Sequence, residues 1–108
     1  MPSAKPTFQP TDLKVKYIRK IGQVGAGKGQ FSQPRGIAIY QGLIFVADTY
    51  NQRVQVFSKF GDWQYLIQPS TNQYQLKAPA SVCIDQYGRI HVVDVSLSQI
   101  LIFDQFGR

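Results

Sequence analysis

The stretch that decides the fold runs from Phe31 to Gly61 and reads F-S-Q-P-R-G-I-A-I-Y-Q-G-L-I-F-V-A-D-T-Y-N-Q-R-V-Q-V-F-S-K-F-G. It contains three short runs rich in β-branched and aromatic residues, Gly36–Ile39, Leu43–Ala47 and Val54–Phe57. Turn-forming residues separate these runs. This alternation predicts three antiparallel strands joined by tight turns.

The same pattern returns between residues 76 and 107, where prolines, apolar positions, an aspartate and a Phe-Gly pair recur in order. Pro79 lies 45 residues after Pro34, and Asp94 lies 46 residues after Asp48. The second copy therefore carries one extra residue in its first turn. A repeat of this length that consists of strands is typical of a β-propeller blade.

The motif resembles a known repeat. F-x-x-P-x-G-I-A-I at residues 31–39, I-F-V-A-D-T-x-N-x-R-V-Q-V-F at residues 44–57 and then Gly61 resemble the NHL repeat, whose family forms mostly six-bladed β-propellers. The second copy matches less well, because loop residues Gly36, Asn51 and Arg53 are replaced by Ser81, Leu97 and Gln99. The resemblance implies an all-β chain with two four-stranded antiparallel blades.

The order of the expected strands divides the chain unevenly. Residues 1–13 contain several prolines and predict an extended arm. Residues 14–108 predict a two-blade unit. Within it, the alternating stretch K-V-K-Y-I-R-K-I at residues 14–21 predicts an outermost strand, residues 31–67 a complete blade, and residues 76–108 a blade without its outer strand.

Two blades alone would leave two broad apolar faces in water, and such faces mark interfaces. If copies of this chain supply the missing blades, three chains give a six-bladed ring with cyclic symmetry. The strand at residues 14–21 would then complete the second blade of the neighbouring copy. Alternatively, the missing blades belong to a longer chain that contains these residues.

Charge and apolar patterning limit the environment and the partners. Twelve Lys and Arg residues against six acidic residues, all of them Asp, give a net charge of +6. A positive field favours nucleic acid, an anionic surface or an acidic partner. No apolar run approaches the roughly 18 residues that span a bilayer, so we expect no membrane association. The start of the chain has no signal-peptide pattern, which favours a cytoplasmic location.

One loop face is the best candidate for binding. The expected links between blades and the turns after the second strand of each blade would place basic and aromatic side chains together there: Lys28, Arg35, Tyr50, Asn51, Arg53 and Lys77. Aromatic side chains beside cations can stack on nucleic-acid bases. Some NHL propellers of the tripartite-motif type bind single-stranded RNA on a positively charged face, so the resemblance permits this function.

Three charged positions are expected to hold the fold. Asp48 and Arg53 flank the turn between the second and third strands, and in NHL repeats the matching pair looks structural, a charge-assisted clamp. The second copy keeps Asp94 but has Gln99 in place of the arginine, which predicts a weaker neutral contact there.

Catalytic residue types are scarce. The single histidine, His91, is expected between blades, and the single cysteine, Cys83, is expected to be a buried small hydrophobe in a different strand. Enzymes on six-bladed propellers, such as the lactonases, hold an axial calcium ion with Glu, Asn and Asp oxygens, and this chain has no Glu. We expect no catalytic residue, no metal site and no cofactor.

The sequence therefore predicts a non-enzymatic propeller module that assembles with itself, a homotrimer being favoured, and binds a protein partner through a loop face. Binding of single-stranded RNA by the basic face is the first alternative. A metal-dependent hydrolase or lyase is the second.

Overall fold

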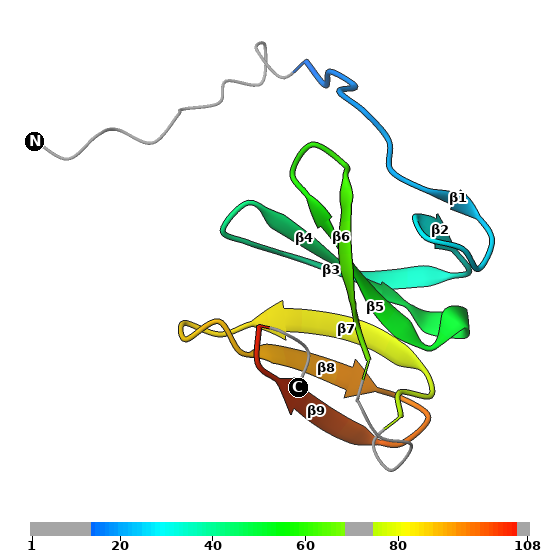
Figure 1. Ribbon diagram of the computed structural model, residues 1–108, viewed down its shortest axis with the longest axis vertical. Helices are drawn as coiled ribbons and strands as arrows, with labels where there is room; N and C mark the ends of the chain where they lie inside the picture. Colours follow the sequence, from blue (N-terminus) through cyan, green and yellow to red (C-terminus); the bar gives the residue numbers. More distant parts are fainter. Residues whose placement is uncertain (1–13, 69–74, 106–108) are drawn as a thin grey trace, which may run out of the picture.

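The computed structural model describes residues 14–68 and 75–105, and within these ranges the chain is all-β (Figure 1). A four-stranded antiparallel sheet is formed by β3 (Pro34–Tyr40), β4 (Leu43–Asp48), β5 (Arg53–Ser58) and β6 (Trp63–Ile67). A three-stranded antiparallel sheet is formed by β7 (Pro79–Ile84), β8 (Ile90–Asp94) and β9 (Gln99–Phe103). A small parallel pair, β1 (Gln23–Val24) and β2 (Gln30–Phe31), lies in the segment before the first sheet, and a 3-10 turn, η2 (Thr49–Asn51), joins β4 to β5. The prediction of an all-β fold with antiparallel blades is confirmed.

The first turn of each sheet differs by one residue, as the offset between the repeats predicted. Gln41 and Gly42 join β3 to β4 with φ angles of 48° and 77°, the combination that a two-residue type I′ hairpin requires. Between the equivalent pairs Ile39–Ile44 and Ile84–Ile90 the second sheet has one more residue, and Gly88 takes the left-handed position with φ 80°. Both sheets then follow the same register, including a bulge in their first strand.

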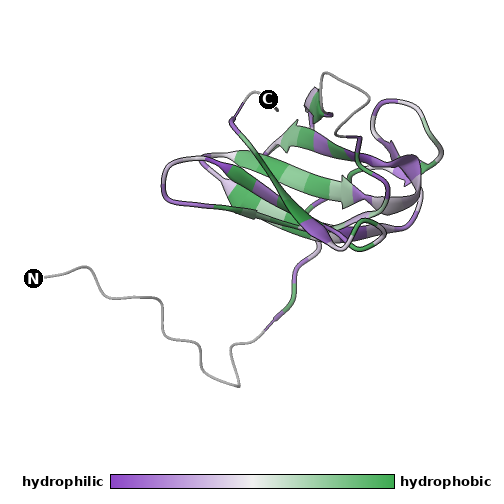
Figure 2. Ribbon diagram, turned by 90° about the horizontal axis from the view of Figure 1, so that it is seen from below, coloured by the Kyte–Doolittle hydropathy of each residue, from purple (hydrophilic) through white to green (hydrophobic). Residues whose placement is uncertain are grey.

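The core lies between the two sheets. Successive residues of a strand point to opposite faces, so each sheet turns one row of apolar side chains toward the other sheet. Figure 2 shows how strongly apolar the strands of both sheets are. The buried cluster consists of Phe45, Val54, Val56, Ile67, Leu76, Val82, Ile90, Val92 and Phe103. The two sheets therefore pack as neighbouring blades do.

Two local features fix the spacing between the sheets at their first strands. A Cβ on Gly36 would lie 2.7 Å from the Cα atom of Ser81 and 2.8 Å from the backbone oxygen of Ala80, so only glycine permits this approach. Nearby, the buried hydroxyl of Thr49 donates a 2.7 Å hydrogen bond to the backbone oxygen of Pro79. Backbone contact and a directed hydrogen bond thus join the two blades.

The segment before the first sheet makes no strand pairing over residues 14–22 with the described part of the chain. It is attached near its end, where the guanidinium of Arg19 donates a 2.8 Å hydrogen bond to the backbone oxygen of Phe60 and lies over the Phe60 ring. The expected role of residues 14–21, as the outer strand of another blade, concerns a second chain and stays a prediction. The expected arm at residues 1–13 lies outside the described residues.

Candidate interaction surfaces

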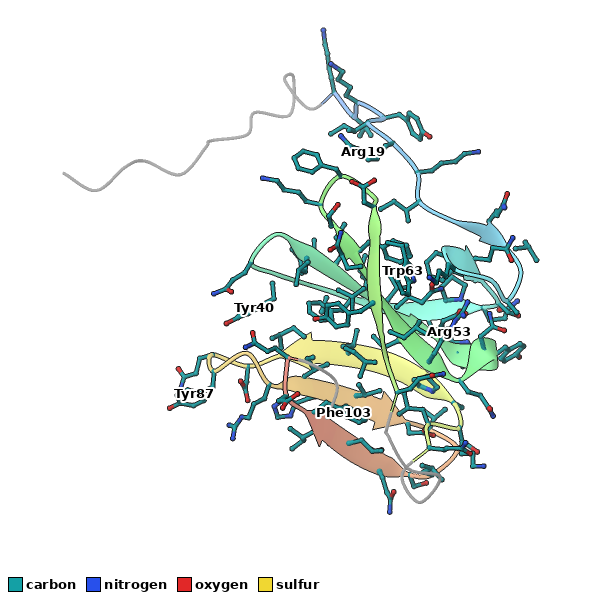
Figure 3. All side chains as sticks on the ribbon, in the orientation of Figure 1. Arg19, Tyr40, Arg53, Trp63, Tyr87 and Phe103 are labelled. Carbon is teal, nitrogen blue, oxygen red and sulfur yellow. The ribbon has the colours of Figure 1, made fainter. Side chains whose placement is uncertain are left out.

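The turn between β4 and β5 is built around a buried carboxylate. Asp48 is fully buried and accepts a hydrogen bond of 2.9 Å from the guanidinium Nε of Arg53, which is only 8% exposed. The same carboxylate accepts the backbone N–H of Ser32 at 2.8 Å and the amide of Asn51 at 3.0 Å. Asp48 at the end of β4 and Arg53 at the start of β5 thus form a buried ion pair. Figure 3 labels Arg53.

Arg53 and Asn51 also hold the glycine-rich link that precedes the first sheet. The Arg53 guanidinium donates to the backbone oxygens of Gly27 and Gln30, both at 2.8 Å. The Asn51 amide donates to the backbone oxygen of Gly25, also at 2.8 Å. Both side chains therefore use their donors inside the fold, which leaves Lys28, Arg35, Tyr50 and Lys77 as candidate binding residues.

The equivalent turn of the second sheet uses other donors for the same carboxylate. Asp94 is buried, and its oxygens accept four backbone N–H groups, those of Lys77 at 2.6 Å and of Ala78, Ser96 and Leu97 at 3.1 Å each. Backbone amides thus satisfy the carboxylate, and the expected dependence on a neutral Gln99 contact is corrected. Any residue except proline supplies such a donor, so this turn survives without the arginine.

The remaining candidate binding residues are all exposed, but they do not form a single cluster. The Arg35 guanidinium lies 5.5 Å from the centre of the Tyr50 ring, and both side chains face solvent. Lys77, at the start of the second blade, is also exposed. Lys28 instead places its ammonium 4.4 Å from the centre of the Trp63 ring on β6. The Arg35–Tyr50 pair is thus a preformed cation–π surface.

A second polar cluster lies at the opposite end of the second sheet, where Figure 3 shows Tyr87 far from Arg53. Asp85 accepts from the guanidinium Nε of Arg89 at 2.7 Å, and one of its oxygens lies 3.0 Å from Nε2 of His91. The hydrogen bond with His91, followed by those from Arg89 and the Tyr87 amide, holds the pKa of Asp85 well below its usual value. The histidine thus has its polar partner within its own blade.

The register of the second sheet also brings Cys83 opposite His91 across β7 and β8. Sequence reasoning placed these residues in different strands and missed that they share one face. Cys83 is exposed, which corrects the expectation of a buried cysteine, because no element of the described chain covers that face. In residues 14–68 and 75–105 no group of three His, Cys, Asp or Glu side chains could hold a metal ion.

Each sheet leaves an apolar surface uncovered. On the first sheet this surface lies over β3, because the link that precedes β3 covers Gln55 and Phe57 of β5. On the first sheet Ile37 and Ile39 are 65% and 72% exposed, and on the second Ile100 and Ile102 are 63% and 55% exposed. Large aliphatic side chains in adjacent strand positions at such exposure mark an interaction surface rather than a solvated one. None of the helical turns that the structure describes is long and apolar enough to cross a membrane.

Comparison with protein families matches residues 31–57 to the NHL repeat, which is the stretch that contains β3, β4, η2 and most of β5. The chain therefore contains an NHL repeat at residues 31–57. Its matched repeat is the blade whose turn is held by Asp48 and Arg53. The second blade repeats the strand register of this NHL repeat while its turn residues differ.

Two relatives align with almost the whole chain. The B-box type zinc finger protein ncl-1 of Caenorhabditis elegans is 32% identical over 151 residues and covers 93% of this chain, and Protein brain tumor of Drosophila melanogaster is 30% identical over 148 residues and covers 94%. The chain spans only 18% and 14% of their lengths. Both alignments are longer than the 108-residue chain, so the relatives carry additional residues inside the matched region.

Proposed function

We propose that this NHL chain is a non-enzymatic propeller building block that assembles with copies of itself and binds a protein partner through its loop face. Three copies would supply six blades in a closed ring. Such a ring would act as an interaction scaffold, because its blades cover one another and its turns face outward. A cytoplasmic location remains our prediction for this module.

The observation that supports self-assembly is the equivalence of the covered and the uncovered faces. The uncovered face of the second sheet carries Cys83, His91, Val93, Ile100 and Ile102. By the repeat offset these positions correspond to Ala38, Phe45, Ala47, Val54 and Val56, which form the first sheet's side of the core. The uncovered face of the second sheet is therefore equivalent, position by position, to the face of the first sheet that packs against a blade within the chain.

The uncovered face of the first sheet has the complementary equivalence. Its apolar residues Ile37, Ile39, Ile44 and Val46 correspond to Val82, Ile84, Ile90 and Val92, which form the second sheet's side of the core. The uncovered faces of two copies could therefore pack against each other as the two covered faces do within one chain. A contact between different faces of identical chains is heterologous, and it closes into a ring when its rotation permits.

The strand inventory supports the same arrangement. Within the described residues β9 has a partner on one side only, so one row of its backbone N–H and C=O groups is open. The stretch at residues 14–21 has unpaired backbone and exposes Val15, Tyr17 and Ile18. Alternating apolar side chains on an unpaired strand suit addition to an open sheet edge. Each copy would complete the second blade of its neighbour.

Light scattering of the purified chain across a dilution series tests this function. A stable mass of three chains is expected at high concentration. An Ile37→Asp variant, which places a charge on the uncovered face of the first sheet, should reduce the mass to one chain while strand content by circular dichroism is retained. A mass of one chain for the unaltered protein at every concentration would contradict self-assembly.

RNA binding is the second candidate function, and the exposed Arg35–Tyr50 pair favours it, because a guanidinium stacked on an aromatic ring is a surface on which a base can stack. Lys77 adds a second free cation on the loop face. Binding of a fluorescent single-stranded RNA should then weaken steeply as salt rises, since bound phosphates release counterions.

The double substitution Arg35→Glu with Lys77→Glu tests the residues of that surface, because both side chains are exposed and neither contributes a side-chain bond to the core. The trimer should be preserved and RNA binding abolished. Affinity that survives this charge reversal would exclude the loop face as the RNA site. If the unaltered chain does not bind RNA, a protein partner remains the proposed ligand of this face.

A further inference from the structure

We infer that Ser81 and Val95 make the contact between copies wider and weaker than the contact between the two blades of one chain, so that the ring opens at chain boundaries. The inference rests on the proposed self-assembly. It follows from comparing, position by position, the contact that the chain contains with the contact that a second copy would make.

The first difference concerns close approach of the backbones. Within the chain, Gly36 allows β3 to reach β7, since a Cβ there would lie 2.7 Å from the Cα atom of Ser81. At the uncovered face of the second sheet, the position of Gly36 is taken by Ser81, 45 residues later. The Ser81 side chain would therefore meet the Arg35–Gly36 backbone of the next copy. Because that obstacle is backbone, the two blades must separate.

The second difference concerns the directed hydrogen bond. Within the chain, the buried hydroxyl of Thr49 donates to the backbone oxygen of Pro79 at 2.7 Å. The equivalent of Thr49 in the second repeat is Val95, and the equivalent of Pro79 in the first is Pro34. Valine has the shape of threonine without a donor, so the contact between copies lacks this bond.

The two differences act on the same part of the contact. Gly36 lies in β3 opposite the end of β4, and Thr49 follows directly after β4. Both belong to the axial half of the blade, whereas the apolar residues Ile100 and Ile102 lie in the outer part of the second sheet. The Ser81 side chain and the absence of a donor at Val95 therefore weaken the contact between copies near the propeller axis. The apolar contact in the outer part of the sheet remains available.

Two substitutions should give the contact between copies the two features that it lacks relative to the contact within one chain. Ser81→Gly removes the side chain that obstructs the approach, and Val95→Thr restores the donor. Each should tighten association of copies by about tenfold, which corresponds to about 1.4 kcal/mol. The double variant Ser81→Gly with Val95→Thr should tighten it by more than either alone, because the closer approach that Ser81→Gly permits shortens the hydrogen bond from the restored hydroxyl to the Pro34 oxygen.

Sedimentation velocity over a wide concentration range measures this effect on the full chain. Val95→Ala is the matched control for Val95→Thr, since it removes methyl groups without adding a donor. Ser96→Gly is the control for Ser81→Gly, since Ser96 is exposed in the neighbouring turn and its side chain lies off the strand face. The controls should not tighten association. Circular dichroism of each variant verifies the strand content.

The outcomes separate this inference from the proposed function. Trimers that dissociate on dilution in the unaltered chain and persist at lower concentration in Val95→Thr and in the double variant would support both. If the concentration at which half of the trimers dissociate is the same in every variant, the inference is overturned and self-assembly stands. Single chains throughout, including the double variant at the highest concentration, would overturn both.

Discussion

Asp48 and Asp94 are equivalent buried carboxylates that fold the same turn with different donors. Each accepts a backbone N–H from the link before its blade, that of Ser32 or of Lys77. Asp48 is then bound by the side chains of Arg53 and Asn51, whereas Asp94 accepts three further backbone N–H groups. A carboxylate with several backbone donors is stabilised without a counter-ion. The donors to Asp48 thus include side chains that mutation can remove, whereas the four N–H donors to Asp94 belong to the backbone.

Replacing Arg53 by the glutamine of the second repeat should therefore destabilise the first blade. The Arg53→Gln variant leaves a buried carboxylate without its cation and removes the two hydrogen bonds that the Arg53 guanidinium donates to backbone oxygens of the link. We expect the free energy of unfolding in urea to fall by about 3–5 kcal/mol, the usual cost of breaking a buried ion pair. The control is Arg89→Gln, in an exposed pair, which should leave the urea midpoint nearly unchanged. Equal effects of the two variants would contradict the structural role of Arg53.

Gly36 should tolerate no side chain. In Gly36→Ala the new methyl group would meet backbone atoms of Ala80 and Ser81 within 2.8 Å, and backbone cannot rotate away. We expect a loss of about 1–3 kcal/mol in unfolding free energy, typical of overpacking. Gly27→Ala is a suitable control, because the added methyl would meet only the flexible end of the Gln30 side chain. If both variants unfold at the same urea concentration, the close backbone contact between the sheets at Gly36 is contradicted.

The hydroxyl of Thr49 should contribute to the packing of the two blades. Thr49→Val keeps the shape but leaves the backbone oxygen of Pro79 without this buried donor. The expected loss is about 1–3 kcal/mol, the range for an unsatisfied buried polar group. Urea unfolding at a fixed protein concentration measures it, since association would shift the midpoint. Ser96→Ala, in the corresponding turn of the second repeat, should have little effect.

Acid should weaken the cluster around Asp85. Its pKa is lowered in the folded chain, mainly by the hydrogen bond with His91. A lowered carboxyl pKa gives stability that is present above the unfolded pKa of about 3.9 and is lost as the pH falls through the folded value. A carbon-detected NMR titration should place the Asp85 midpoint below the usual Asp range. In His91→Phe, the residue type of the first repeat, the midpoint should move up toward the ordinary value. An unchanged midpoint would show that His91 does not stabilise the carboxylate.

The strand frame of both blades could be predicted from the sequence, because alternation and turn residues act locally. The change of offset from 45 residues at Pro34 and Pro79 to 46 at Asp48 and Asp94 even located the longer turn of the second blade. The chemistry of that blade could not be predicted in the same way. Asp94 is satisfied by backbone amides, which every residue type carries, so the identity of residue 99 says nothing about it.

The binding surfaces depended on contacts between distant segments. Arg53 was expected both in the fold and on the loop face, and only its bonds to Gly27 and Gln30 show that its guanidinium is occupied internally. Cys83 and His91 are eight residues apart, and the longer turn between β7 and β8 sets them opposite each other on an open face. Composition identified both residues, but register decided their exposure.

The two blades of one chain are joined covalently through the segment between β6 and β7, and copies of the chain are not. A covalent connection holds the second blade at an effective concentration in the millimolar range beside the first, without any contact being stronger. The interface that contains Gly36 and Thr49 therefore closes whenever the chain folds, at any dilution. Contacts between separate molecules have no such tether, so for the ring that we propose, the abundance of the protein in its compartment would decide how many rings are closed.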